Sequence, residues 1–599
     1  MATFLLEVGT EELPADFARK VNPQLEKLVE RDLTQRRLSY ETIKCTSTPR
    51  RIVLIVEGLA NSATDSEEEH KGPPAAQAFD NGSPTKAALG FANRFGFDPY
   101  ALEVRETPKG PFVFLKVLEP GANTQDLLRQ MIPNWIGNIQ GRRFMRWGGG
   151  ERRFSRPARW LVALLDESLI PVTLKGTDPA VLSGTTSRGH RLFSQDVFVP
   201  SAKDFSATLS EVGVLIHRNE RKSLIKDLIE TASHDLKAIP DLSDDLLEEL
   251  TDLVEFPSLV KGEFDQSFLD LPAEILSTVM RVHQRYVPLY LENAPIDLLS
   301  LDAKNNLLPK FLCISNGLSS AAQSIQIGNE RVLRARLADA EFFVRADLAI
   351  ASMDRTKQLS HVTFAEGLGT LLDRVERIKW ITSKLFEELN TIKVDKKIVL
   401  RAAHLCKHDL VTQMVGEFPE LQGVIGAKYL LAEGELREVS LAVMEHYLPK
   451  VAGGELPYSE AGSVLALADK FELLLSIFGK GERPSGSSDP YALRRAGNGI
   501  LQILWSKGWK LNLNKIIKKS IDKWSNLLTN LNIDKQNLFI ELSEFFHQRM
   551  ISLLEENQID IDIVNSIAGV TSSLNRLLSD PEDVRFRAEL LVKMRKSGE

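Results

Sequence analysis

The sequence predicts a multi-domain α+β protein whose N-terminal region is mixed α/β and whose remaining regions are mainly helical. Its 599 residues exceed the roughly 100–200 residues of a typical domain, so several domains are expected. Up to about residue 205, apolar runs of strand type alternate with helical patterns, and beyond residue 206 helical spacing dominates. Hydrophobic residues make up 43% of the chain and charged residues 26%, which is typical of a folded globular protein.

The elements of the N-terminal region can be located from residue patterns. Strands are predicted at FLLEVGT (4–10), RRIVLIVEGL (50–59) and FVFLKVLE (112–119), where apolar and β-branched residues form short runs. Helices are predicted at 11–33 and 124–139, where apolar residues recur with helical spacing. This alternation is what makes the region mixed α/β.

The segment 61–90 between these elements is polar and is interrupted by Pro73, Pro74, Gly82 and Pro84. Because such residues interrupt helices and strands, we expect a loop here.

The later part of the chain shows one more strand pattern, LPKFLCISN at 308–316, and is otherwise helical. Clusters of Gly and Pro at 452–457 and 479–490 mark the clearest breaks between helices. We therefore predict four regions: an α/β region at 1–205, a mostly helical continuation at 206–325, a helical domain at 326–500, and a helical C-terminal region at 501–599.

The net charge and the cysteines limit the function classes. The net charge of -7 does not favour a nucleic-acid partner, but it is an average, and phosphate binding needs only a local basic stripe. Cys45, Cys313 and Cys406 are far apart, so neither a disulfide framework nor a metal-binding CxxC spacing is present. The N-terminus lacks a basic signal sequence and no run of 18 apolar residues occurs, so we expect a cytoplasmic protein without a membrane span.

A basic segment, GRRFMRWGGGERRFSRPARW at 141–160, is the strongest candidate for nucleic-acid binding. Arginine side chains match phosphate oxygens bidentately, and aromatic rings stack on unpaired bases. The alternative is a strand-loop-strand whose aromatic residues lie in the core and whose arginines pair with acids from elsewhere. The RNA-contact candidates are Arg142, Arg143, Arg146, Arg152, Arg153, Arg156, Arg159 and Trp147.

A second group of residues has the chemistry of metal ligands. His404 and His408 are four residues apart and share a helix face, Asp409 follows directly, and Asp469 lies on a later predicted helix. This pattern resembles the metal-dependent HD phosphohydrolase family. That family needs a further histidine on an earlier helix, where this sequence has Arg374 and Arg377, and an arginine repels a cation. We therefore expect an HD-like site that is degenerate, with no bound metal and no catalytic residues.

A lysine-rich run at 505–524 has two equally good interpretations. On a helix, its lysines could follow an RNA backbone, or they could form a solvated face. The lysines are Lys507, Lys510, Lys515, Lys518, Lys519 and Lys523. No GxxxxGK[ST] or GxGxxG phosphate-binding motif is present, so no self-contained ATP site is predicted.

Several collinear stretches over roughly residues 1–500 resemble the beta subunit of bacterial two-subunit glycyl-tRNA synthetases. They are FLLEVGTEELP, STPRRIVLIVEGL, KGPPAAQAFDNGSPTKAALGFANRFG, FMRWGGGERRFSRPARW, SRGHR, GNERVLRARLADAEFF, HDLVTQMVGEFPELQGVIGAKY, LALADKFELLLSIFG and DPYALRRAGNGIL.

The resemblance implies a fold, partners and a division of labour. It implies an N-terminal region similar to the B3/B4 region of phenylalanyl-tRNA synthetase, an HD-like helical domain and a helical anticodon-binding-type region. The family's C-terminal domain runs further than residue 599, so a truncated chain is expected. It also implies an α2β2 enzyme that uses ATP and Mg²⁺, in which the alpha subunit forms the adenylate and the beta subunit binds tRNA-Gly without a cofactor of its own.

Two other functions remain open from the residues alone. An HD-type metal-dependent phosphohydrolase acting on nucleotides or RNA would use His404, His408, Asp409 and Asp469. A structural RNA chaperone would bind many RNAs equally and would need no partner subunit.

Overall fold

The computed structural model describes residues 1–80, 82–192, 196–294, 297–389, 391–486, 488–569 and 572–597. The chain forms two compact units. Unit 1 comprises Met1–Gly262, Arg285–Val287 and Leu312–Gly328, and unit 2 comprises Glu263–Gln284, Pro288–Phe311 and Asn329–Glu599. The predicted α+β class is confirmed: the N-terminal part contains the large sheet and the C-terminal part is helical. The division into four regions stays a prediction.

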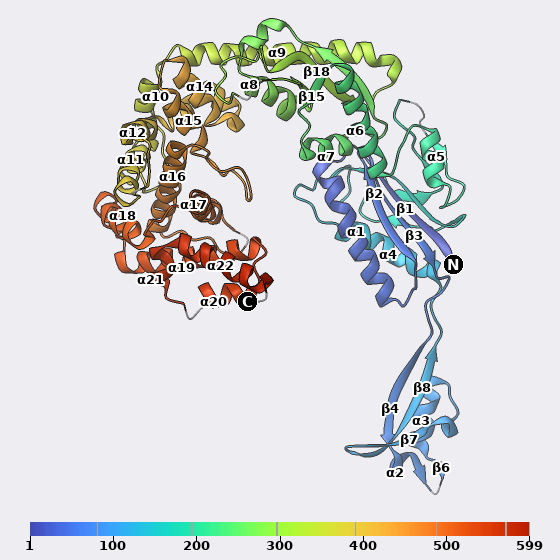
Figure 1. The fold of residues 1–599 in the computed structure, drawn as a ribbon. Helices are drawn as coiled ribbons and strands as arrows, with labels where there is room; N and C mark the ends of the chain where they lie inside the picture. Colours follow the sequence, from blue (N-terminus) through green and yellow to red (C-terminus); the bar gives the residue numbers. More distant parts are fainter. Residues whose placement is uncertain are drawn as a thin grey trace. The chain divides into compact units, whose positions relative to one another are not determined.

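A seven-stranded sheet organises unit 1 (Figure 1). Its strand order is β11-β12-β9-β1-β3-β2, with β10 paired to β9, and all these pairs are antiparallel except β12 with β9. The strands are β1 (Ala2–Thr10), β2 (Thr42–Thr48), β3 (Arg51–Leu59), β9 (Ala158–Leu165), β10 (Ser168–Leu169), β11 (Thr173–Leu174) and β12 (Val181–Gly184). The predicted strands at 4–10 and 50–59 are confirmed.

Helices cover both faces of this sheet. Phe4, Leu6 and Val8 of β1 pack with helices α1 (Ala15–Gln35) and α4 (Thr124–Asn138) on one face, while Leu5 packs with α5 (Phe205–Glu211) on the other. Successive side chains of a strand point to opposite faces, so a strand covered on both sides is apolar at nearly every position. All nine residues of β1 are buried for this reason.

The prediction of a loop at 61–90 is wrong. The segment contains β4 (Ser66–Pro74), α2 (Ala75–Ala78), β5 (Phe79–Asp80), β6 (Ser83–Pro84) and the start of α3 (Lys86–Phe95). After α3 come η1 (Pro99–Ala101), β7 (Glu103–Thr107) and β8 (Gly110–Glu119). Strand β4 is polar, but it pairs with the more apolar β8 along most of its length, so its partner stabilises it. Ala88, Val113 and Leu115 contribute to a small separate core beside this sheet.

Two further groups of elements complete the first half of the chain. One is the pair β13 (Thr186–Ser187) and β14 (Val197–Phe198), followed after α5 by α6 (Arg218–Asp235) and α7 (Asp244–Leu253). The other is a sheet in the order β15-β17-β18-β16. It is formed by β15 (Ala238–Pro240), β16 (Ser258–Glu263), β17 (Val287–Leu291) and β18 (Leu307–Ser315), with η2 (Gln266–Asp270), α8 (Ala273–Thr278) and η3 (Val279–His283) between β16 and β17.

A buried ionic cluster joins distant parts of unit 1. Arg51 of β3 is fully buried and forms ion pairs with Glu7 of β1 at 2.8 Å and with Glu255 at 3.0 Å. Glu255 also accepts a hydrogen bond from Thr48 and pairs with Arg50 at 2.8 Å. The cluster therefore ties the interior strands β1 and β3 of the large sheet to the segment after α7.

Unit 2 is built from helices around one large apolar core, to which α11, α12, α16, α17, α18 and α19 contribute. The helices from residue 322 onward are α9 (Ala322–Leu348), α10 (Ser352–Gln358), α11 (Leu371–Glu388), α12 (Lys396–Leu405), α13 (Gln413–Glu417), α14 (Val424–Ala432), α15 (Arg437–Glu445), α16 (Glu460–Gly479), α17 (Leu493–Lys507), α18 (Leu513–Leu527), α19 (Lys535–Glu556), α20 (Ile561–Ala568), α21 (Leu574–Ser579) and α22 (Pro581–Ser597). Helix α16 lies at the centre of this core, with most of its residues buried.

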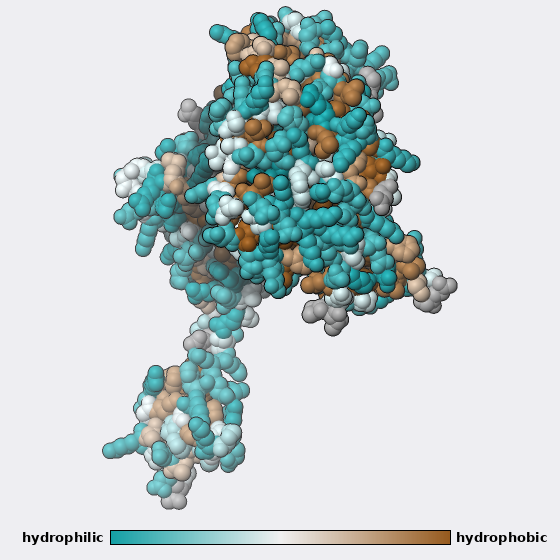
Figure 2. Space-filling view, turned by 90° about the vertical axis from the view of Figure 1, so that its left-hand side faces the viewer, coloured by the Kyte–Doolittle hydropathy of each residue, from teal (hydrophilic) through white to brown (hydrophobic). Residues whose placement is uncertain are grey.

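One face of the molecule is mainly hydrophilic. On the face shown in Figure 2, polar residues cover most of the area and apolar residues form small separate groups. Among the described residues, no helix has both the length and the apolar character needed to cross a membrane.

Candidate nucleic-acid interface

The arginine-rich segment 141–160 links α4 to β9 in unit 1. Backbone hydrogen bonds in both directions between Met145 and Phe154, at 2.8 and 3.1 Å, fold it back on itself. The segment therefore has a defined conformation, with arginines in both arms of the fold.

The three glycines at the tip of this segment are there for close packing. Gly148 has a φ of +58°, and a Cβ atom on it would lie 1.9 Å from the carbonyl oxygen of Asp178. The N–H of Gly149 donates to the Asp178 carboxylate at 3.2 Å, and a Cβ on Gly150 would meet the oxygen of Gly176 at 2.4 Å. The absence of a side chain at these positions therefore lets the turn approach the neighbouring backbone closely.

The aromatic residues of the segment belong to the core. Trp147, Phe154 and Trp160 are only 9%, 2% and 8% exposed. Phe144 and Phe154 pack edge-on against Phe17 of α1, with ring centroids 5.9 and 5.6 Å apart. Burial leaves Trp147 without a free face for a base, which argues against the stacking role that the sequence suggested for it.

The arginines behave differently from the aromatic residues. Arg142, Arg143, Arg146, Arg153 and Arg159 are exposed, and Arg152 and Arg156 are half-buried. Within the described part of the chain, only Arg159 has a carboxylate within the 4.0 Å ion-pair limit, the side chain of Glu11 at 2.7 Å. Arg152 and Arg156 donate to the backbone oxygens of Lys175 and Ser155 instead. Six of the seven arginines thus form no ion pair with a carboxylate of the described residues.

Three of these arginines line a pocket of about 690 Å³ between the start of α1 and the segment 140–156. Arg142, Arg143 and Arg156 lie there with Lys20, and Asp16 is the acid in the lining. A hydrogen bond from Lys20 and the charge of Arg142 lower the pKa of Asp16. Four cations against one acid make this pocket suited to an anion of phosphate size or larger.

The residues of the HD-like pattern lie in unit 2 but are engaged separately. His408 contacts the backbone oxygen of Gly426 at 3.1 Å, and Asp409 accepts a hydrogen bond from the N–H of Gly423 at 2.6 Å. His404 is half-buried, and its nearest carboxylate, Glu376, is 3.8 Å away. The side chains of these residues therefore do not surround a common metal-binding position.

Asp469, the fourth residue of the pattern, holds two cations. Lys407 and Arg374 both lie 3.0 Å from its Oδ1 atom. The Lys407 ammonium is also 2.9 Å from Nε2 of His446 and is 1% exposed. Burial raises the pKa of Asp469, but the charges of Lys407 and Arg374 outweigh burial and hold it well below its usual range.

This geometry does not fit a divalent metal. A metal ion bound at Asp469 would share one carboxylate oxygen with two fixed positive charges. In the described part of the chain, no three His, Cys, Asp or Glu side chains are grouped for metal binding. The sequence analysis identified Arg374 as a cation in this region but not Lys407, although Lys407 directly precedes the His-Asp doublet.

Comparison with known proteins identifies the family. The model of the family described as glycyl-tRNA synthetase beta subunit matches residues 4–569. The glycine–tRNA ligase beta subunits of Acaryochloris marina and Trichodesmium erythraeum are 43% and 42% identical, each over 100% of this chain and 82% of the relative. That of Halothermothrix orenii is 36% identical over 99% of this chain and 82% of its own length. The chain therefore belongs to the glycyl-tRNA synthetase beta subunit family.

Proposed function

We propose that this chain binds tRNA-Gly through the arginine segment 141–160 and positions its 3′ end for glycylation by an alpha subunit. The observation that carries the proposal is the set of six arginines without a carboxylate partner among the described residues, three of which line the basic pocket. Phosphate contacts of this kind fix the register of a nucleic acid without reading its sequence. Holding two reactants in register lowers the barrier to their reaction.

The chain acts in this proposal as a subunit without catalytic residues. The alpha subunit of an α2β2 enzyme forms the adenylate with ATP and Mg²⁺ in the cytoplasm, and this chain binds neither ATP nor metal. The cations at Asp469 support this division, because they leave the HD-like site unsuited to the metal that a phosphohydrolase needs.

The test measures tRNA-Gly binding and charging with purified alpha subunit, ATP and glycine. The double variant Arg142→Ala/Arg143→Ala should weaken tRNA binding at least about 10-fold, because it removes two phosphate contacts. The matched control Arg31→Ala/Arg129→Ala removes two exposed arginines of α1 and α4 that already pair with Asp32 and Asp126.

The expected result is loss of binding and charging in the first variant only, and charging only when both subunits are present. Equal losses in both variants would show that general charge, and not this segment, holds the tRNA. Charging by this chain without an alpha subunit would overturn its non-catalytic role.

A further inference from the structure

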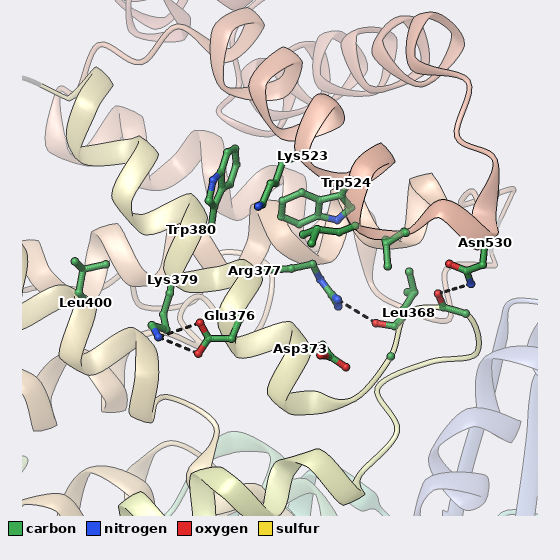
Figure 3. Close-up of a pocket in the computed structure, with 14 residues that line it drawn as sticks. Leu368, Asp373, Glu376, Arg377, Lys379, Trp380, Leu400, Lys523, Trp524 and Asn530 are labelled. Carbon is green, nitrogen blue, oxygen red and sulfur yellow. Dashed lines mark hydrogen bonds and ion pairs between the residues drawn. The ribbon is translucent and has the colours of Figure 1, made fainter.

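A second pocket lies within unit 2 and is unrelated to the arginine segment. It has a volume of about 800 Å³ and is formed by the turn at 367–369, α11, α12 and the end of α18 (Figure 3). This volume falls within the range of about 300–1,000 Å³ that is usual for small-molecule sites.

One side of the pocket is aromatic. Trp380 of α11 is half-buried and packs edge-on against Trp524 of α18, with ring centroids 5.9 Å apart and planes at 63°. Trp524 is fixed in place because its indole N–H donates to Ser476 at 2.9 Å. Leu400 is half-buried and Leu527 is 50% exposed on the same lining. Trp524 is fully buried, so the accessible aromatic surface is that of Trp380, and a partly exposed ring held against a fixed neighbour is suited to stacking with a flat ring.

The polar groups of the pocket leave positive charge available. Of the two acids, Glu376 is neutralised by Lys379 at 2.9 Å, whereas Asp373 stays charged and accepts hydrogen bonds from the N-cap residue Thr370. Lys523, by contrast, forms no hydrogen bond or ion pair with any residue that the structure describes. Figure 3 shows Lys523 beside Trp380 and Trp524, so a cation and an aromatic surface lie along the same side.

The back of the pocket carries a buried guanidinium group. Arg377 is 4% exposed, donates from Nε to Glu472 at 2.7 Å and from Nη1 to the oxygen of Leu368 at 3.0 Å. Its Nη2 atom has no hydrogen-bond partner among the described residues. Because Nη2 has almost no accessible surface, a molecule in the pocket does not reach it, and Arg377 forms part of the pocket wall without contacting a ligand.

We propose that this pocket binds a nucleotide, with the base against Trp380 and the phosphate at Lys523. Every base presents a flat π face and carries acceptor atoms, and stacking on an aromatic side chain is tolerant of base identity. An apolar protein side chain would fill the same volume but would leave Lys523 without a partner. A free mononucleotide and an unpaired nucleotide of an RNA share this chemistry. The site is separate from the tRNA contacts proposed above and does not depend on them.

The first experiment measures binding of adenosine monophosphate, guanosine monophosphate, ribose 5-phosphate and a single-stranded RNA hexanucleotide to the full chain by calorimetry. Both monophosphates should bind, and ribose 5-phosphate should bind at least about 10-fold more weakly because it has no base to stack. Tighter binding of the hexanucleotide would identify an RNA nucleotide as the ligand of the pocket. Tighter binding of the monophosphates would identify a free nucleotide as the ligand. No binding of any nucleotide or of the hexanucleotide would overturn the proposal.

Two variants and a matched control locate the site. Trp380→Ala should weaken nucleotide binding about 10-fold by loss of stacking, and Lys523→Glu by a similar factor through repulsion of the phosphate. Lys518→Glu makes the same charge change on α18 but lies away from the pocket, with its Nζ over Phe539, and should leave binding unchanged. Lys523 is half-buried and forms no hydrogen bond or ion pair with a described residue, so Lys523→Glu tests the site even where Trp380→Ala unfolds the chain. Unchanged binding in the folded variants, or equal weakening by Lys518→Glu, would contradict the proposal.

Discussion

At the scale of single residues, Lys407 explains most clearly why an HD-like pattern has no HD-like site. Its buried ammonium is held by Asp469 and His446, and burial lowers the pKa of this lysine. The arrangement resembles a coordination site in which an amino group of the chain takes the place of a metal ion. Because the cation at this position is the Lys407 ammonium, we infer that Asp469 and His446 stabilise the fold.

The variant Lys407→Met tests this interpretation. It should lower the free energy of unfolding by about 3 kcal/mol, since removing one partner of a buried ion pair leaves a carboxylate with less compensation. The double variant Lys407→Met/Asp469→Asn should recover at least half of this loss, because both charges are then removed. Urea unfolding measures both values.

Lys379→Met is the control for this prediction. Lys379 pairs with Glu376 at a more exposed position, with side chains 31% and 55% exposed, so its loss should cost less than about 1 kcal/mol. A Lys407→Met protein as stable as the parent would contradict the structural role of the buried ammonium.

At the scale of elements, the glycine turn determines how the arginine segment is presented. Gly148→Ala should destabilise unit 1 by at least about 2 kcal/mol, because φ is +58° and the added Cβ would collide with the backbone of Asp178. It should also weaken tRNA binding, since the arginines on both sides of the turn would move. Thermal unfolding and tRNA binding measure the two effects.

Gly90→Ala provides the opposite case for comparison. Gly90 lies inside α3, and a Cβ there meets no atom within 4 Å. The change should stabilise by up to about 1 kcal/mol, because alanine favours helix more than glycine does. Equal destabilisation by the two substitutions would mean that close packing is not what requires glycine at position 148.

Within the ionic cluster of unit 1, Glu255 predicts a dependence of stability on pH, whereas burial raises the pKa of Glu7. Burial raises the pKa of Glu255, but the charges of Arg51 and Arg50 outweigh it and lower the pKa to about 2 from an ordinary value of 4.5. The pKa of the folded state is therefore the lower one. The stabilisation is complete above about pH 4.5, falls as the pH drops toward 2, and amounts to about 3 kcal/mol.

Glu255→Gln should remove this contribution. At pH 7 the variant should be less stable by about 3–5 kcal/mol, since two arginines lose a buried partner. Below pH 4.5 the difference from the parent should shrink, because Glu255 takes up a proton in the unfolded parent chain while it is still ionised in the folded one. The exposed substitution Glu30→Gln in α1 should change little at either pH. A stability difference that stays constant between pH 5 and 3 would contradict the assignment, because about 2 kcal/mol of the pH-dependent stabilisation from Glu255 should be lost over this interval.

How much the sequence predicted depends on whether an element is apolar by itself. Strand β1 and helix α1 were predicted correctly because burial gives each a repeating apolar pattern. Strand β4 was missed because its residues are polar and only its pairing with β8 makes it a strand. The packing of Lys407 against Asp469 was missed for a similar reason, since residues 62 positions apart in sequence meet only through the folding of α16.

At the scale of the whole molecule, the question is how a chain with a net charge of -7 binds a polyanion. Averaged over the chain, electrostatics oppose tRNA. Binding must therefore depend on a local surface where positive charge is unneutralised, and in unit 1 the arginine segment has that property. Exposed arginines that already have acidic partners, such as Arg129, add little to the attraction.

The salt dependence of tRNA-Gly binding tests this argument. Phosphate contacts release counterions, so the logarithm of the binding constant falls linearly with the logarithm of the salt concentration. Arg142→Gln and Arg143→Gln should each reduce the magnitude of this slope by about 1, whereas Arg129→Gln should leave it unchanged. The slopes are measured by filter binding of labelled tRNA-Gly between low and physiological salt. If all three variants altered the slope equally, binding would follow overall charge, and the arginine segment would not be the surface that contacts the phosphates.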